Sequence, residues 1–291
     1  MSTSSGMRIV TRTVYGAAMQ TAQYLGIPYV PTDNRGTLNL KFEILSNTTP
    51  PAGSSHEVQY YVIGNGGHEA ITGANGVPYT RPVPHAATDA ALFNHLPFVL
   101  RPVNNDLTAD QRSNYALRRT ETHNGQDYYA YYAKRVPMST VSVEMHRVMV
   151  DETTGETSET AFVPDQDNLN PTPQQVYDSN GEVIVSGEYV TGSGIAEIAF
   201  TETDAAELRE VARILYDNED MAIISEIGMV GGTDIDTSVL TTGNVEVTFS
   251  EVVAAQVTTF VAVYYQLSMQ NNGFDFTADI GITEPLFAVS G

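Results

Sequence analysis

Six histidines and thirty-five acidic residues are the side chains that could carry metal or acid–base chemistry. None of the histidines stands in His-x-His or His-Glu-x-x-His, spacings that bring two imidazoles onto one metal ion. Single histidines are typical of surface positions or of hydrogen-bonded positions in a core. We therefore expect no metal site from these residues: His56, His68, His85, His95, His123 and His146.

Paired acids and glycine-rich stretches are the other patterns with chemical meaning. "DQDNLN" (165–170) and "DIDTS" (234–238) open like Ca²⁺-binding loops, but neither has glycine at the sixth position or glutamate at the twelfth. Such pairs are typical of Asx turns, with an irregular Ca²⁺ site as the alternative. "GNGGHE" (64–69) and "GSGIAE" (192–197) have glutamate where a dinucleotide-binding turn has its third glycine, so both predict ordinary turns.

Motifs for nucleophilic catalysis and for phosphate binding are missing as well. The sequence has no cysteine, no Gly-x-Ser-x-Gly and no P-loop motif. We therefore expect no catalytic, cofactor-binding or metal-binding residues, and a protein that is not an enzyme. Glycoside hydrolysis is the alternative left open, since it needs only two carboxylates about 5 to 10 Å apart in space.

The charge balance limits the partners. A formal net charge of -21 and a pI of about 4.4 describe a surface that repels phosphate. Binding to nucleic acid or to an anionic membrane is therefore not expected. The apolar run 253–267 is interrupted by Gln256, Thr258, Thr259 and Gln266, so it does not predict a spanning helix, which needs about 20 predominantly apolar residues. The first twenty residues lack the apolar region of a signal peptide, which predicts synthesis in the cytoplasm without processing.

Alternation of apolar and polar residues predicts a β-rich fold. "TLNLKFEIL" (37–45) alternates as a half-buried strand does. The segment 253–267 is apolar on both faces of a strand, which is typical of a strand covered on both sides. Asn271-Asn272-Gly273 predicts a turn, after which "FDFTADIGI" (274–282) would return as the second strand of a long hairpin. We expect another molecule to hide the remaining apolar side of this sheet.

Two helices are predicted, at about 108–119 and 203–216. The first begins with a capping-box spacing, Thr108 followed by Gln111. The second has a cap at Thr201 or Thr203 and apolar residues at helical spacing: Leu208, Val211, Ala212 and Leu215.

The fold class expected from these elements is α+β and β-rich, with antiparallel sheets or a sandwich and a few packed helices. A stretch near residues 164–175 is rich in Pro, Asn and Asp, which predicts a boundary. The expected division is an N-terminal β-rich part, 1–165, and a C-terminal part, 166–291, with a helix and a long β-hairpin. One continuous domain is the alternative.

Clustered aromatic residues are the candidates for an interface. Tyrosine is enriched at protein interfaces because its ring buries area while its hydroxyl finds a partner. The alternative is a strand that packs these rings within one subunit. The candidate interface residues are Tyr128, Tyr129, Tyr131, Tyr132, Tyr264, Phe274 and Phe276.

Three segments resemble structural proteins of contractile-tailed bacteriophages. "ISEIGMVGGTD" (224–234) carries a Glu-Ile-Gly element at Glu226 to Gly228, and the strand–turn segment 257–286 follows it. Segment 90–119, "AALFNHLPFVLRPVNNDLTADQRSNYALRR", also resembles virion proteins of these phages. The resemblance implies a baseplate, neck or other tail-associated protein.

The function that the resemblance implies is a non-enzymatic structural component of the virion, at the baseplate, that joins neighbouring tail proteins. Its partners would be copies of itself and other tail or baseplate proteins, as an oligomer in a symmetric assembly, with no cofactor, nucleic acid or membrane. A neck, collar or tail-completion protein is one alternative. A receptor-recognition protein that binds or cleaves glycans is another.

Overall fold

The computed structural model describes residues 9–285 apart from 30, 32–33, 152–153, 155, 165, 167–168, 170–178, 181–187, 241–245 and 268–272. The chain forms two compact units. The larger unit comprises 1–136 and 199–274, and the smaller comprises 137–198 and 275–291. The expected β-rich α+β class, with antiparallel sheets and few helices, is confirmed.

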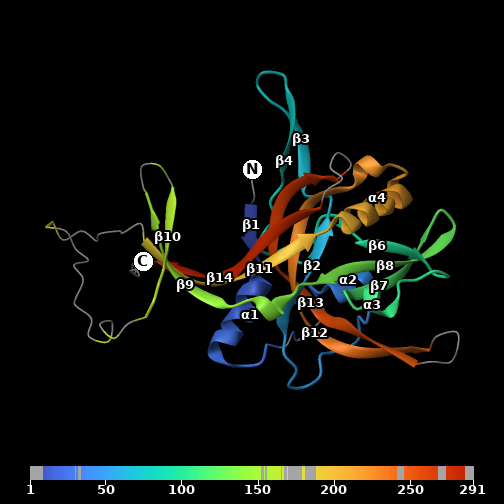
Figure 1. Ribbon diagram of the computed structural model, residues 1–291, viewed down its shortest axis with the longest axis horizontal. Coiled ribbons are helices and arrows are strands. Elements are labelled where there is room, and N and C mark those ends of the chain that lie inside the picture. Colours follow the sequence, from blue (N-terminus) through green and yellow to red (C-terminus); the bar gives the residue numbers. More distant parts are fainter. Residues whose placement is uncertain are drawn as a thin grey trace. The chain divides into compact units, whose positions relative to one another are not determined.

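An eight-stranded antiparallel sheet organises the larger unit (Figure 1). Its strand order is β1-β13-β12-β2-β8-β6, with β5 paired to β2 and β7 paired to β8. These strands are β1 (Ile9–Arg12), β2 (Glu57–Gly64), β5 (His95–Leu96), β6 (Val99–Pro102), β7 (Tyr115–His123), β8 (Gln126–Arg135), β12 (Ile223–Leu240) and β13 (Glu246–Gln266). A separate hairpin, β3 (His68–Thr72) and β4 (Pro78–Pro82), projects from this unit in Figure 1.

Strand β13 is covered by its own chain. The adjacent residues Val252 and Val253 point to opposite faces, and both are buried. Helix α1 (Val14–Leu25) lies directly on the strand, since a Cβ added at Gly16 would be 2.3 Å from the backbone oxygen of Thr258. The expected cover on both faces is confirmed, but the expectation that another molecule supplies it is wrong for this strand, because α1 and neighbouring segments of the same chain bury it.

The segment 37–45 forms a helix, so the predicted strand is wrong. Helix α2 (Leu38–Phe42) is capped by the Thr37 hydroxyl, which accepts a hydrogen bond from the Leu40 N–H. The Asn39 side chain explains the difference, because it donates to the Val252 oxygen at 2.8 Å and accepts from the Ala255 N–H at 2.8 Å. This tertiary contact buries a polar residue that the alternating pattern assigned to solvent.

The two predicted helices have different outcomes. Helix α4 (Glu202–Tyr216) agrees with the prediction to within a residue and begins with a capping box between Thr201 and Asp204. Helix α3 (Ala109–Arg112) has the predicted capping box but is a single turn. Its predicted continuation to residue 119 is wrong, because residues from Tyr115 onward pair with β8 as strand β7. Two 3₁₀ turns, η1 (Met138–Thr140) and η3 (Glu219–Met221), complete the described helical segments.

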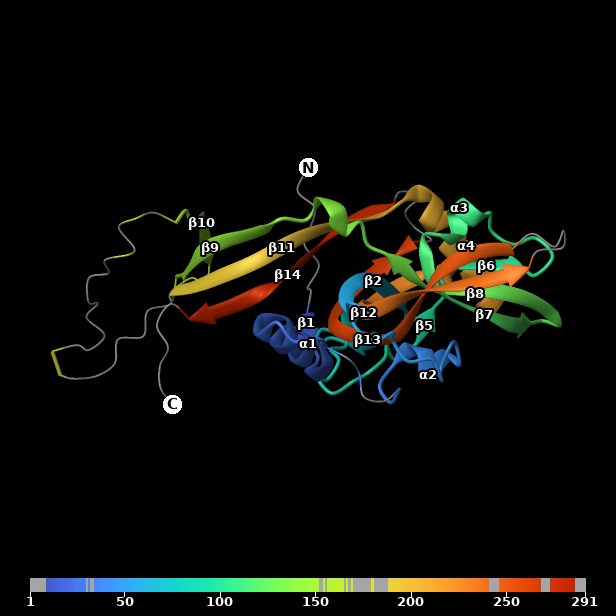
Figure 2. The same ribbon diagram turned by 90° about the horizontal axis from the view of Figure 1, so that it is seen from below.

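The smaller unit contains one four-stranded antiparallel sheet of order β10-β9-β11-β14. Figure 2 shows β9, β11 and β14 running side by side. The strands are β9 (Val143–Val150), β10 (Thr157–Ala161), β11 (Glu188–Phe200) and β14 (Phe274–Pro285).

Strand β14 belongs to this sheet, so the predicted hairpin of β13 with residues 274–282 is wrong. Glycines let β14 approach β11, because a Cβ at Gly281 would lie 2.4 Å from the Gly192 oxygen. Residues 271–272 of the predicted turn lie outside the described residues. The boundary expected at 165/166 falls inside the smaller unit, since pairing of β9 with β11 joins segments on both sides of it.

Candidate functional site

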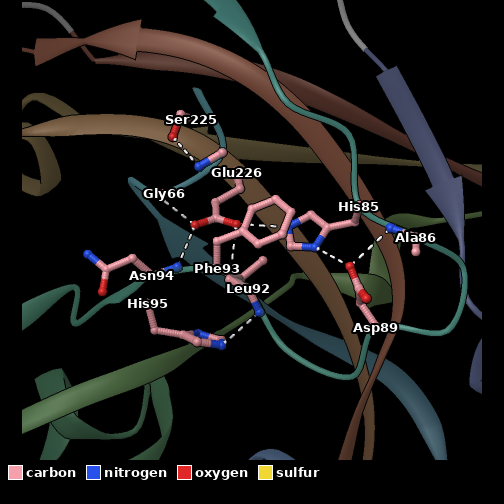
Figure 3. A network of polar contacts seen from close by, with 11 residues as sticks. Gly66, His85, Ala86, Asp89, Leu92, Phe93, Asn94, His95, Ser225 and Glu226 are labelled. Atoms are coloured by element: carbon pink, nitrogen blue, oxygen red, sulfur yellow. Dashed lines mark hydrogen bonds and ion pairs between the residues drawn. The ribbon is translucent and has the colours of Figure 1, made fainter. Parts of the chain in front are cut away.

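The carboxylate of Glu226 is the centre of the most connected polar network in the larger unit (Figure 3). Glu226 pairs with Ala262 of β13 on one side and with Gly64 of β2 on the other, so its backbone lies in the interior of the sheet. The carboxylate oxygens accept hydrogen bonds from the backbone N–H groups of Gly66, Phe93 and Asn94, each at 2.9 Å. The side chain is fully buried, and these donors compensate the loss of its hydration.

His85 links this carboxylate to a second one. Its Nε2 lies 2.8 Å from Glu226 Oε2, and its Nδ1 lies 3.1 Å from Asp89 Oδ2. The imidazole is stacked between the rings of Phe93 and Phe260, with both centroids 3.9 Å away. A histidine donates to both carboxylates as imidazolium and to one of them as the neutral ring. The ring is therefore fixed by two hydrogen bonds and two stacking contacts.

The glycine-rich turn after β2 is shaped to receive the network. A Cβ at Gly64 would lie 2.6 Å from Glu226 Oε1, and one at Gly66 would lie 2.8 Å from the Asn94 nitrogen. The Gly67 N–H donates to the hydroxyl of Ser225 at 3.0 Å. The sequence predicted a turn here, and the close approach of backbone to a buried carboxylate is the physical reason for its glycines.

The network ties three segments together: the turn at 64–67, the loop at 85–94 and strand β12. The hydrogen bonds of this network stabilise the packing of the three segments. Both ring nitrogens of His85 already face carboxylates, and both His85 and Glu226 side chains have no exposed surface. These two side chains are therefore closed to solvent, and their hydrogen bonds join the three segments.

Sequence reasoning did not assign this network. Glu226 was noted only as part of the Glu-Ile-Gly element, and His85 was expected to be one of several surface or hydrogen-bonded histidines. The contacts join residues 141 positions apart, which no local pattern reveals. The available signal was the "GNGG" turn, because its glycines indicate a close backbone approach.

Two candidate interface tyrosines are buried within the chain. The Tyr131 hydroxyl donates to Asp106 at 2.6 Å, and the Tyr132 hydroxyl donates to Glu121 at 2.5 Å. Burial, reinforced by these neighbouring carboxylates, raises the pKa of both phenols, so both remain protonated donors at neutral pH. Their neighbours Tyr128 and Tyr129 are half-buried, and the Arg118 guanidinium lies 4.2 Å above the Tyr129 ring.

The other candidate aromatic residues lie on two different strands. Tyr264 of β13 is 37% exposed and contacts the His68 ring edge-on at 5.2 Å. Phe274, at the start of β14, stacks on Tyr265 with centroids 4.3 Å apart and is half-buried. Phe276 is buried. Of the seven candidates, Tyr264 is therefore the most exposed.

A hollow of about 270 Å³ lies beside the network and is lined mainly by polar and aromatic side chains. His95 lines it, and its Nε2 accepts a hydrogen bond from the Leu92 N–H at 3.0 Å. Burial, together with the charge of Lys41, lowers the pKa of His95 to about 3, so the ring is neutral at physiological pH. Arg119 on the same hollow is already paired with Glu121 at 2.5 Å.

The acid pairs that resemble Ca²⁺ loops form no described metal site. Asp234 of "DIDTS" binds Arg135 at 2.7 Å and accepts the Tyr60 hydroxyl at 2.7 Å. "DQDNLN" falls largely outside the described residues. Within the part of the chain that the structure describes, no three His, Asp or Glu side chains are grouped to hold a metal ion.

Comparisons with known proteins give a family but no activity. Among the described residues, no helix has the length and apolar character needed to cross a membrane. No curated protein and no solved structure matches the sequence. A family model does match it over residues 1–291, and the chain belongs to this family of unknown function, DUF7208.

Proposed function

We propose that the protein is a non-enzymatic structural component of a tailed-phage virion, at the baseplate, that joins neighbouring tail proteins. The single observation that carries the proposal is the composition of the smaller unit's sheet. Among its described residues within 137–198 and 275–285, the buried side chains are Ser193, Ala196, Ile198 and Phe276. Most other described side chains of this unit are at least partly exposed, including large apolar ones.

Such a sheet needs a cover to be stable. A sheet gains free energy by burying one face against a second layer, at roughly 25 cal/mol per Å² of apolar surface. Strand β9 instead exposes Val143, Met145 and Met149. A subunit that completes its core on assembly accounts for this pattern, because association then supplies the missing layer.

The larger unit supports the same reading. Its histidine–carboxylate network is sealed, and the hydroxyls of its central tyrosines are bonded to acids of the same chain. These contacts give a rigid body with its polar groups engaged, as a building block requires. The segments that resemble phage structural proteins, 90–119, 224–234 and 257–286, favour the virion as the assembly.

The test is the presence of this chain in purified particles. Quantitative mass spectrometry of virions from a phage that encodes the chain should find it in fixed, low copy number. Electron microscopy of the same particles should place it at the baseplate, while density at the neck or collar would favour that alternative. Absence from particles, or release of reducing sugar from a glycan panel by the purified chain, would overturn the proposal.

A further inference from the structure

One face of the smaller unit's sheet gathers exposed apolar side chains. Met149 is paired with Glu188, Arg147 with Val190, and Met145 with Gly192, so alternate residues of β9 and β11 share this face. Phe162 follows β10, and its N–H donates to the Met145 oxygen, which continues the ladder opposite Met145. We call this surface the methionine face and define it by Val143, Met145, Met149, Phe162 and Val190.

Each of these side chains is more than a third exposed. Val143 is 80% exposed, Met145 and Met149 are 47% and 48%, Phe162 is 44% and Val190 is 38%. Five neighbouring apolar side chains on one sheet face are a contiguous patch, whereas isolated exposed ones need no explanation. A shallow hollow lined by Arg147, Met149, Ser158, Thr160 and Glu188 lies on the same face.

The opposite face of the sheet has a different character. His146 lies there, 3.3 Å from Glu159 and 3.7 Å from Glu144. Val148 and Val150 on that face are half-buried, and Tyr189, which pairs with Val148, is 38% exposed. Ile195 lies on the same side by alternation along β11 and is 49% exposed. The methionine face therefore carries four of the six exposed large apolar side chains of β9 and β11.

Charge limits what can cover the methionine face. Its described charged groups are Arg147 and Glu188, which form an ion pair with Nε 3.0 Å from Oε2. Arg147 is the sole lysine or arginine in the sequence of the smaller unit, 137–198 and 275–291. The sequence of the unit holds fourteen acidic residues; Glu156 is exposed directly before β10, whereas Glu144 and Glu159 lie on the opposite face beside His146. The methionine face is therefore an apolar patch with one internal ion pair on a strongly acidic unit.

We propose that the methionine face docks a different protein of the same assembly, whose complementary surface is apolar at its centre and rich in lysine and arginine at its edge. The proposal rests on the structural function above and adds the surface and the partner's chemistry. A second copy of this chain would bring a second strongly acidic unit, and like charges across an interface oppose association. Methionine suits the centre because its flexible thioether adapts to the shape of the partner.

The test adds a charge to the methionine face within the full chain. A phage lacking the gene is complemented with wild type, Met149→Glu or Thr157→Glu, and the chain is quantified in purified particles. Thr157 is exposed on the opposite face of the same sheet, one position along the β9–β10 ladder, so it is the matched control. We expect Met149→Glu to lower incorporation at least tenfold and Thr157→Glu to leave it within about twofold of wild type.

Folding and charge are measured on the same variants. Both sites are exposed, so soluble yield and circular dichroism should match wild type in both variants. Glu156→Lys, which reverses an exposed charge directly before β10, should lower incorporation less than Met149→Glu but measurably. If folded Met149→Glu enters particles at the wild-type level, the docking inference is overturned, but the presence of the wild-type chain in particles still supports the structural function. If the wild-type chain is absent from particles, both proposals are overturned.

Self-association is the competing occupant. Sedimentation of the purified chain should show a species that Met149→Glu does not change. A dimer that Met149→Glu abolishes and Thr157→Glu preserves would show that a second copy covers the face, and it would overturn the choice of a basic-rimmed partner.

Discussion

The two units differ in how far their apolar and charged side chains are buried. In the larger unit, β13 is covered by its own chain and the Glu226 carboxylate is enclosed by backbone donors. In the smaller unit, β9 exposes Val143 and both methionines, and its one arginine pairs with Glu188 near the surface. The same strand-forming alternation therefore yields a closed core in one unit and an uncovered face in the other. Substitutions that test this contrast should lower the free energy of unfolding strongly in the larger unit and weakly in the smaller unit.

Glu226→Gln should have the largest effect. The amide keeps the shape of the side chain but replaces one accepting oxygen with an NH₂ group, which would face donors from Gly66 and Asn94 or from Phe93 and His85. Disrupting a buried, bonded charge costs about 3 to 5 kcal/mol. We expect the free energy of unfolding, measured in urea by circular dichroism, to fall by about 3 kcal/mol or more.

The matched control is Glu188→Gln, which removes a carboxylate from the ion pair of the smaller unit. Surface pairs contribute about 0 to 1 kcal/mol, so this change should be small. Equal losses for the two variants would remove the contrast between the units.

Gly16→Ala should be next in size. The added methyl group would lie 2.3 Å from the Thr258 oxygen, which belongs to backbone, so α1 must move away from β13. Overpacking of this kind costs about 1 to 3 kcal/mol. Gly192→Ala in the smaller unit is the control, since its Cβ meets no atom within 4 Å. A thermal midpoint for Gly16→Ala no lower than that for Gly192→Ala would contradict the close contact of α1 with β13.

The sequence predicted elements whose signals are local. The Thr201 capping box and apolar spacing located α4, and the run 253–267 located β13. Prediction failed where a distant contact decides the outcome. Asn39 turns 38–42 into a helix by bonding to Val252, which is 213 residues away. Pairing with β8 likewise takes the residues after Ser113 out of the predicted helix.

The polar network and the exposed face were beyond the sequence for different reasons. His85 and Glu226 are 141 residues apart in the sequence, and no local pattern around either residue predicts their contact. The methionine face depends on the register of β9 against β11, which the separated segments do not specify. Candidate aromatic residues were chosen by type alone, and type does not distinguish buried Tyr131 from exposed Tyr264.

Acid should destabilise the larger unit through two histidines. Burial lowers the pKa of His56 to about 4 and, with the charge of Lys41, that of His95 to about 3, against about 6.5 in the unfolded chain. Between these values the unfolded state binds more protons, so stability is complete above about pH 6.5 and falls as pH decreases toward 4 and 3. Each histidine contributes at most about 1.4 kcal/mol per pH unit.

Urea titrations at pH 7, 6 and 5 measure this slope. His56→Gln should flatten it relative to wild type, because the substituted side chain no longer takes up a proton on unfolding. Val143→Ser in the smaller unit removes no titratable group, so it is the control and should leave the slope unchanged. A wild-type slope that His56→Gln does not reduce would exclude a buried neutral histidine at that position.

Val143→Ser should have the smallest effect on stability. It tests directly whether the exposed face of the smaller unit differs from the buried core of the larger unit. Val143 is 80% exposed, so the free chain loses little buried apolar surface, and the expected change in stability is within about 0.5 kcal/mol. Val257→Ser places the same substitution at a fully buried site of β13 and should cost several times more, because it creates a cavity and leaves a buried hydroxyl. Both are measured by urea unfolding of the isolated chain. A loss above about 1 kcal/mol for Val143→Ser would mean that the chain itself covers the methionine face, and the surface would then be unavailable to a partner.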